Sequence, residues 1–212
     1  TAAVMSIGIL APLGYVLSPS LLGLVNAAPE VQAEALQYLR IMFMFSFGMI
    51  VCLMIGGALR SAGDAHTPLR LGSMLTALNI TLNVILIPGL GPIPAFGTTG
   101  AAMGTVIAGA LMAVVYVYFL FSGKWVVAFR RGMNWRPDFG IIRELFRFGI
   151  PTGLQGVAMN VGGVMLLAYI GSLPHSGEAQ AAYVISYTQL FSLITWTSAG
   201  LLGATAAVCG QN

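Results

Sequence analysis

The chain has 212 residues, of which 7% are charged and 58% are hydrophobic. Ordinary soluble domains carry roughly 25% charged residues, so this composition excludes a water-soluble fold. Nine Lys and Arg against six Asp and Glu give a formal net charge of +3. These charges lie in short stretches between long apolar runs, a pattern that argues against a nucleic-acid partner. The sequence predicts a protein whose main surroundings are the lipid bilayer.

Six apolar runs follow one another along the chain, separated by short stretches rich in proline, glycine and polar residues. Each run has about 20 residues or more, enough for a helix to cross a hydrocarbon core ~30 Å thick. The runs cover residues 2–25, 29–59, 69–87, 99–121, 149–173 and 179–209. The first run lacks a charged leading segment and a cleavage site, so we expect a spanning helix there and not a signal peptide. The predicted fold class is all-α, a polytopic helical membrane protein with six transmembrane helices.

The composition changes between residues 123 and 148, where six basic residues and two tryptophans interrupt the apolar pattern. We expect a domain boundary here. Residues 1–122 then hold four helices, residues 123–148 form a linker and residues 149–212 hold two helices. Within the linker, apolar and charged side chains alternate over residues 139–148, which is typical of a short amphipathic helix lying in the headgroup layer.

Basic residues gather in the loop at residues 60–70 and in the linker, and such residues favour the cytoplasmic side of a membrane. Placing both segments there puts eight basic residues inside and only Arg40 towards the outside. We therefore expect a multi-pass protein of the cell (inner or plasma) membrane with both ends of this chain on the cytoplasmic side.

The few polar side chains within the apolar runs are the candidates for function, because polar groups in a membrane serve ion and substrate pathways or helix contacts. Asn79 and Asn83 are four residues apart and share one helix face. Two roles fit this pair: bonding to a neighbouring helix, or lining a cation or proton pathway. Arg40 fits either an anchor that reaches the outer surface or a part in gating and packing.

Five polar and aromatic residues in the last two runs are candidates for a substrate cavity. Gln155 and Asn160 lie in the fifth run beside glycines that permit close helix approach, so packing alone also explains them. Tyr183, Tyr187 and Gln189 lie in the sixth run. The two tyrosine rings suit either packing or an aromatic-lined cavity that attracts organic cations.

Catalytic and metal-binding patterns are missing from the sequence. Cys52 and Cys209 lie far apart in apolar runs, and His66 and His175 are isolated loop residues. His175 and Glu178 have His-x-x-Glu spacing without further ligands. Partnered nucleophiles, zinc-protease motifs and phosphate loops do not occur. We expect neither an enzyme nor a metal site nor a cofactor.

Four motifs occur in an order and spacing that resemble one transporter family. They are Tyr38-Leu39-Arg40-Ile41, then Gly57-Ala58-Leu59-Arg60-Ser61-Ala62-Gly63-Asp64-Ala65-His66-Thr67-Pro68, then Asn79-x-x-Leu82-Asn83, then Gly97-x-x-Gly100-Ala101-Ala102-x-x-Thr105. Gly149-Ile150-Pro151, Ala181-Ala182 and Gly210-Gln211-Asn212 extend the likeness. Over nearly its whole length the chain resembles the multidrug and toxic compound extrusion (MATE) family.

This resemblance implies a fragment that runs from about the third to the eighth helix of a twelve-helix, two-lobe transporter, with the remaining helices as partners. In that family the lobes rock about a central cavity and export organic cations or other amphiphiles in exchange for Na⁺ or H⁺. Asn79 and Asn83 fall on the family's fifth-helix polar pair, and Thr105 falls in the neighbouring sixth-helix motif. The resemblance therefore implies that these three residues belong to the cation site of the first lobe.

The chain departs from the family pattern at three positions. Asn83 stands where many members have Asp, which removes one negative charge from the cation site. Met159 stands where some members carry a Glu, and Val184 where a Gln is frequent.

We expect a secondary active efflux antiporter that works by alternating access on small amphipathic or cationic substrates. Two alternatives stay open. One is a related flippase for lipid-linked saccharides, for which Arg40 is the only candidate basic residue in the cavity. The other is a membrane scaffold that does not transport.

Overall fold

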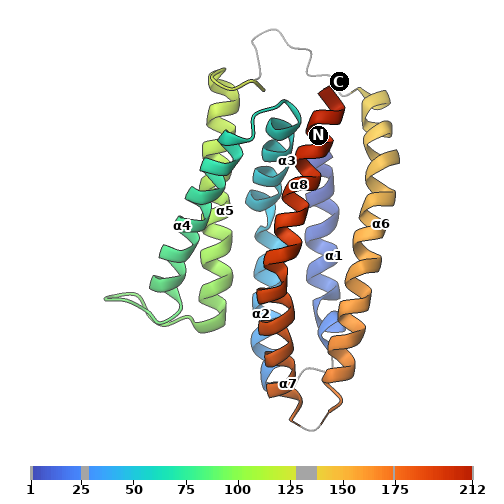
Figure 1. Cartoon of the computed structure of the whole chain (residues 1–212). Coiled ribbons are helices and arrows are strands. Elements are labelled where there is room, and N and C mark those ends of the chain that lie inside the picture. The colour runs from blue at the N-terminus through green and yellow to red at the C-terminus, as the bar shows by residue number, and fades with distance from the viewer. Residues whose placement is uncertain (1, 25–28, 128–137, 174, 212) are drawn as a thin grey trace.

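The computed structural model describes residues 2–24, 29–127, 138–173 and 175–211. Every regular element in these ranges is a helix, which confirms the all-α class (Figure 1). The elements are α1 (Ala2–Leu24), α2 (Pro29–Phe45), α3 (Phe47–Ser61), α4 (His66–Leu86), α5 (Gly97–Ser122), α6 (Phe139–Ile170), α7 (Ser176–Tyr183), the π-helix η1 (Val184–Phe191) and α8 (Ser192–Gln211). The long helices lie lengthwise beside one another, with α4 and α5 on one side of the bundle and α6 on the other.

The six apolar runs correspond to α1, α2 with α3, α4, α5, α6, and α7 with η1 and α8. Among the described residues, α4, α5 and α6 are each long and apolar enough to cross a membrane, and α2 with α3 would make a fourth crossing. This pair is bent by 53° between Val31–Phe45 and Phe47–Ser61. At the break Ser46 Oγ donates a hydrogen bond to the Phe43 carbonyl at 3.3 Å, and such side-chain bonds to the backbone accompany bends in helices.

The helix α6 differs from the sequence-based expectation, because the amphipathic segment at residues 139–148 does not form a separate helix. One helix of 32 residues runs from Phe139 to Ile170. The carboxylate of Asp138 caps its start by accepting the backbone N–H groups of Gly140 at 2.8 Å and Ile141 at 3.3 Å. Pro151 removes one backbone hydrogen bond without ending the helix.

The buried core lies where α3 and α4 pack on α5. Its buried side chains are Val51, Cys52, Leu59, Leu71, Met112, Ala113 and Tyr116. At the crossing of α3 and α5, a Cβ on Gly48 would collide with the backbone of Gly109 and Ala110. Such close approach is how helices associate in lipid, where burial of apolar side chains alone supplies little driving force.

The polar loop predicted around residues 60–68 is a compact turn. Gly63 has a φ of +88° and its N–H donates to the Arg60 carbonyl at 3.0 Å, while the Asp64 N–H donates to the Leu59 carbonyl at 2.9 Å. These two bonds form a Schellman motif that ends α3. The Asp64 carboxylate then accepts the Thr67 N–H at 2.9 Å and so caps the start of α4. Hydrogen bonding from the side chain and backbone of Thr67 holds the pKa of Asp64 below its ordinary value.

Both ends of the chain lie at the same end of the bundle as the α3–α4 turn and the start of α6 (Figure 1). The charge pattern requires this arrangement, because it placed all of these segments on one side of the membrane. Which side that is stays a prediction. Arg130, Arg131 and Arg136, on which part of that prediction rests, lie outside the described residues.

Candidate cation site between helices α4 and α5

The structure brings together the three residues that the sequence assigned to a cation site. Asn79 and Asn83 lie on α4, and Thr105 faces them from α5. The Asn79 amide donates to Thr105 Oγ1 at 3.1 Å, and the Asn83 amide donates to Asn79 Oδ1 at 3.2 Å. Thr105 Oγ1 in turn donates to the Ala101 carbonyl at 3.0 Å. The result is a continuous chain of hydrogen bonds from α4 to α5, formed by half-buried side chains.

One oxygen of this cluster is left without a partner. Asn83 Oδ1 is buried and accepts no hydrogen bond from any described residue. A buried acceptor left unpaired costs about 1–3 kcal/mol, so its persistence calls for a physical reason. A positively charged ligand at this oxygen would supply one.

Gly104 on α5 makes room for that oxygen. Gly104 is buried, and a Cβ there would collide with Asn83 Oδ1. Sequence reasoning missed this residue, although it directly precedes Thr105 in the motif that was singled out. Its role depends on the register between α4 and α5, which the sequence does not reveal.

The chemistry of the cluster is that of neutral oxygen donors. Two amide oxygens and one hydroxyl oxygen are hard ligands of the kind that binds alkali and alkaline-earth cations. No group of three or more His, Cys, Asp or Glu that could hold a metal ion occurs in the described part of the chain. A cation at this site would therefore be held by neutral oxygens.

The five candidates for a substrate cavity form two separate sets. Tyr183 and Tyr187 stack with ring centroids 5.3 Å apart, and Phe191 continues the stack at 5.4 Å from Tyr187. Phe191, four residues after Tyr187, was not among the residues predicted from the sequence to line a cavity. Gln189 is exposed on the π-helix η1, which also holds Tyr187 and Phe191.

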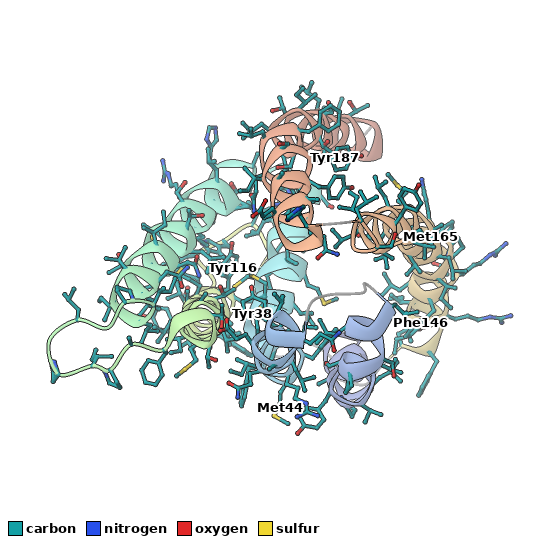
Figure 2. The ribbon with its side chains drawn as sticks, turned by 90° about the horizontal axis from the view of Figure 1, so that it is seen from below. Tyr38, Met44, Tyr116, Phe146, Met165 and Tyr187 are labelled. Atoms are coloured by element: carbon teal, nitrogen blue, oxygen red, sulfur yellow. The ribbon has the colours of Figure 1, made fainter. Side chains whose placement is uncertain are left out.

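The other two candidates, Gln155 and Asn160, are exposed on α6. The Asn160 amide donates to the Gly156 carbonyl of its own helix at 2.8 Å. Among the described residues, neither side chain forms a hydrogen bond to the stack of Tyr183, Tyr187 and Phe191. Figure 2 shows Tyr187 on its π-helix and Met165 on the neighbouring α6.

Arg40 packs α2 against α1. Its guanidinium lies over the ring of Tyr15, 4.7 Å from the ring centroid, and its Nε is buried. A cation over an aromatic ring is attracted by the electrons of the ring face. This contact favours the packing role over that of an anchor at the outer surface.

Comparison with known proteins shows which family the chain resembles. Residues 1–85, which include Asn79 and Asn83, match the MatE family model. The probable multidrug resistance protein NorM of Thermotoga maritima is 27% identical over 156 residues, which cover 72% of this chain and 33% of that protein. The chain is therefore similar to the MATE family over its first 85 residues.

Two further relatives extend the match. The probable multidrug resistance protein YpnP of Bacillus subtilis is 27% identical over 94% of this chain and 42% of its own length. The multidrug export protein MepA of Staphylococcus aureus is 27% identical over 80% of the chain and 36% of its own length. The matches cover less than half the length of each of these relatives.

A solved structure shows that the fold is shared as well. It is described as the inward-facing conformation of a multidrug resistance MATE family transporter of the MOP superfamily. The TM-score is 0.66, with 21% identity, over 99% of this chain and 50% of that chain. This agreement confirms the all-α helical fold.

Proposed function

We propose that the chain is part of a secondary active efflux transporter in which Asn79, Asn83 and Thr105 bind the coupling cation. The observation that carries the proposal is the buried, unpaired Oδ1 of Asn83 beside Gly104. The names of the MATE relatives, which describe multidrug resistance and export, support efflux of drug-like substrates.

Cation binding at this cluster would change how α4 meets α5. Asn79 Oδ1 and Thr105 Oγ1 are engaged in the hydrogen-bonded chain, so a cation that takes them as ligands must rearrange the bonds between the two helices. A ligand shifts a conformational equilibrium only through such differential contacts. Binding and release of the ion would thereby favour different packings of α4 on α5, which alternating access requires.

The cluster fits Na⁺ better than H⁺. Amide and hydroxyl groups do not take up protons near neutral pH, whereas their oxygens coordinate a hard cation. Proton coupling would need a titratable group from another part of the protein. No cofactor is needed in either case.

We propose that the substrate is a small amphipathic or cationic molecule. The stack of Tyr183, Tyr187 and Phe191 offers aromatic faces that attract an organic cation, and Gln189 lies on η1 with Tyr187 and Phe191. Gln155 and Asn160 on α6 would contribute polar contacts when α6 and η1 face one cavity.

Transport assays of the full reading frame test the proposal. Efflux of a fluorescent organic cation is measured in cells while the Na⁺ and H⁺ gradients are collapsed separately. We expect efflux to stop when the Na⁺ gradient is lost. Efflux that follows only the H⁺ gradient would contradict the Na⁺ assignment, and no efflux from a well-inserted protein would favour the saccharide flippase or the scaffold.

The variants Asn79→Ala and Asn83→Ala test the site itself. We expect each to weaken the Na⁺ dependence of efflux about tenfold or more, the effect of losing one charge-assisted contact. Insertion should persist, because an interhelical hydrogen bond in a membrane is worth only about 1 kcal/mol. Thr81→Ala is the matched control, since Thr81 is exposed on α4 and bonds the Ala77 carbonyl of its own helix. Unchanged ion dependence in both Asn variants would refute the assignment.

We also propose that the end of the bundle with both chain ends faces the cytoplasm. Lys124 is exposed at that end, just after α5. A single cysteine at this position, Lys124→Cys in a background without the native cysteines, should react with a membrane-impermeant maleimide only after the membrane is opened. Labelling of intact cells would reverse the topology.

A further inference from the structure

The cation cluster lies one helical turn from the loop that joins α4 to α5. This loop, residues 87–96, lies at the end of the bundle away from both chain ends (Figure 1). The Ile87 N–H donates to the Asn83 carbonyl at 3.0 Å, so the loop begins directly at the turn that carries Asn83. On α5, Gly100 lies about one turn before Gly104, against which Asn83 Oδ1 fits. The geometry at the base of the loop therefore reaches the cluster through one turn of each helix.

Backbone hydrogen bonds close the loop at its base. The Phe96 N–H donates to the Leu86 carbonyl at 3.0 Å, and the Gly97 N–H donates to the Ile87 carbonyl at 3.1 Å. The last carbonyls and the first N–H groups of a helix have no partners within that helix. Here the end of α4 supplies acceptors and the start of α5 supplies donors, so each helix end satisfies the other. These two hydrogen bonds are called the backbone clasp below.

A close approach at Gly100 fixes how α4 and α5 meet beside the clasp. Gly100 is buried, and a Cβ there would lie 2.6 Å from the Leu86 carbonyl oxygen. Ordinary van der Waals contact begins at about 3.4 Å, so a side chain at this position would push the carbonyl away by about 0.8 Å. A backbone carbonyl cannot rotate aside as a flexible side chain does. Glycine at this position therefore permits the observed spacing of the two helices.

We propose that the clasp and Gly100 set the register of α4 on α5 and thereby hold the cation ligands in place. This inference rests on the proposed function of the cluster. Contacting positions advance in opposite directions along the two helices, because Leu86 meets Gly100 and Asn83 meets Gly104. A displacement at the first contact is therefore passed on to the second.

The cluster tolerates little displacement. The hydrogen bond from the Asn79 amide to Thr105 Oγ1 is 3.1 Å long, and a side-chain hydrogen bond is lost at about 3.6 Å. Binding sites need their ligands held within about 0.5 Å of the productive geometry. A displacement of about 0.8 Å at Gly100 exceeds both limits. Gly100 is thus a positioning residue, which touches no ion but on which the affinity for Na⁺ depends.

Gly89 keeps the loop in the shape that the clasp requires. Its φ is +74°, a backbone conformation that favours glycine, and a Cβ there would lie 2.6 Å from the backbone nitrogen of Ala95. Gly91 in the same loop also has a positive φ, of +63°, but a Cβ there would meet nothing within 4 Å. Substitution of either glycine strains the backbone, whereas only substitution of Gly89 also disturbs a contact within the loop.

Calorimetric titration of Na⁺ into the purified protein from its full reading frame tests the proposal. We expect Gly100→Ala to weaken Na⁺ binding about tenfold, the effect of losing one contact to the ion. Gly72→Ala on α4, whose Cβ meets open space, should leave the affinity unchanged. Calorimetry reports affinity and stoichiometry separately, so a general folding defect, which lowers the fraction of protein that binds, is told apart from misplaced ligands.

Asn83→Ala, measured in the same way, separates this inference from the proposed function. If Asn83→Ala weakens Na⁺ binding and Gly100→Ala does not, the positioning role is wrong and the cation site stands. If neither variant changes the affinity, or if the original protein binds no Na⁺, the cation site is wrong and the positioning role falls with it.

Variants of the loop test the clasp without a change in either helix. Gly89→Ala should weaken Na⁺ binding about threefold or more, whereas Gly91→Ala should leave it unchanged. Equal affinities in these two variants would overturn the role of the loop. Two glycines inserted after Gly91 should also leave the affinity unchanged, since the cost of closing a loop grows slowly with its length. A loss after this insertion as large as that in Gly100→Ala would show that loop length sets the register, and would overturn the proposal.

Discussion

The helices α5 and α6 are both apolar enough to cross a membrane, yet they pack very differently. On α5, nine residues are buried, among them Gly104, Gly109 and Tyr116, whereas no described residue of α6 is buried. Glycines alone do not explain this difference. On α6, a Cβ at Gly153, Gly156 or Gly163 would meet nothing within 4 Å.

The difference lies in what faces the glycines. Gly48 of α3 meets the backbone at Gly109 of α5, and Asn83 of α4 meets Gly104 of α5. Each close approach therefore joins a small residue to a backbone or a polar side chain on the neighbouring helix, and such contacts hold helices together in lipid. The comparison teaches that apolar composition suits a helix to the membrane, while matched small and polar residues hold α3, α4 and α5 together in this part of the protein.

The largest effect should come from closing the α3–α5 contact. Gly48→Ala places a Cβ against the backbone of Gly109, which cannot move as a flexible side chain can. We expect a loss of about 1–3 kcal/mol in stability, the usual cost of overpacking. Thermal unfolding in detergent measures the effect. Gly163→Ala on α6 is the control and should be neutral or slightly stabilising, since its Cβ meets open space. Equal losses of stability in both variants would contradict the difference in packing between α5 and α6.

A smaller effect on stability but a specific one on function should come from Gly104→Ala. The added methyl displaces Asn83 Oδ1, so we expect the apparent Na⁺ affinity in the efflux assay to fall about tenfold. Gly72→Ala on α4 is the matched control, because a Cβ there has no neighbour within 4 Å. If the two variants keep the same Na⁺ affinity, Asn83 Oδ1 is not a ligand.

The smallest effect should come from the turn between α3 and α4, the two helices that pack on α5. The pKa of the Asp64 carboxyl lies below its ordinary 3.8 because of hydrogen bonds from Thr67. A lowered pKa in the folded state means that the charged carboxylate stabilises the turn above about pH 3.8 and loses this effect as the pH falls through the folded-state value.

Asp64→Asn keeps a side-chain oxygen for the cap but removes the charge. We expect the variant to unfold at a slightly lower temperature than the original protein near neutral pH, and the two to converge in acid. Unfolding temperatures measured at a series of pH values check this. A difference in unfolding temperature that grows as the pH falls would contradict the lowered pKa of Asp64.

The sequence alone determined where the helices lie and which residues are polar within them. Hydropathy is a sum over neighbouring residues, so the apolar runs and the turn around Gly63 could be predicted without knowledge of packing. The spacing of Asn79 and Asn83 placed both on one helix face, because that depends only on helix geometry. The motifs that resemble the MATE family were also visible in the sequence.

Only the tertiary structure decided which helix meets the face that carries Asn79 and Asn83. The hydrogen bond from Asn79 to Thr105 and the fit of Asn83 Oδ1 against Gly104 join residues more than 20 positions apart, and their register follows from the packing of α4 on α5. The continuity of α6 through Pro151 and the bend at Ser46 also depended on the whole fold, since a proline or a serine permits several local outcomes. Local sequence predicts which segments are helical, whereas the bends within helices and the contacts between distant segments are settled by the shapes and polar groups that meet.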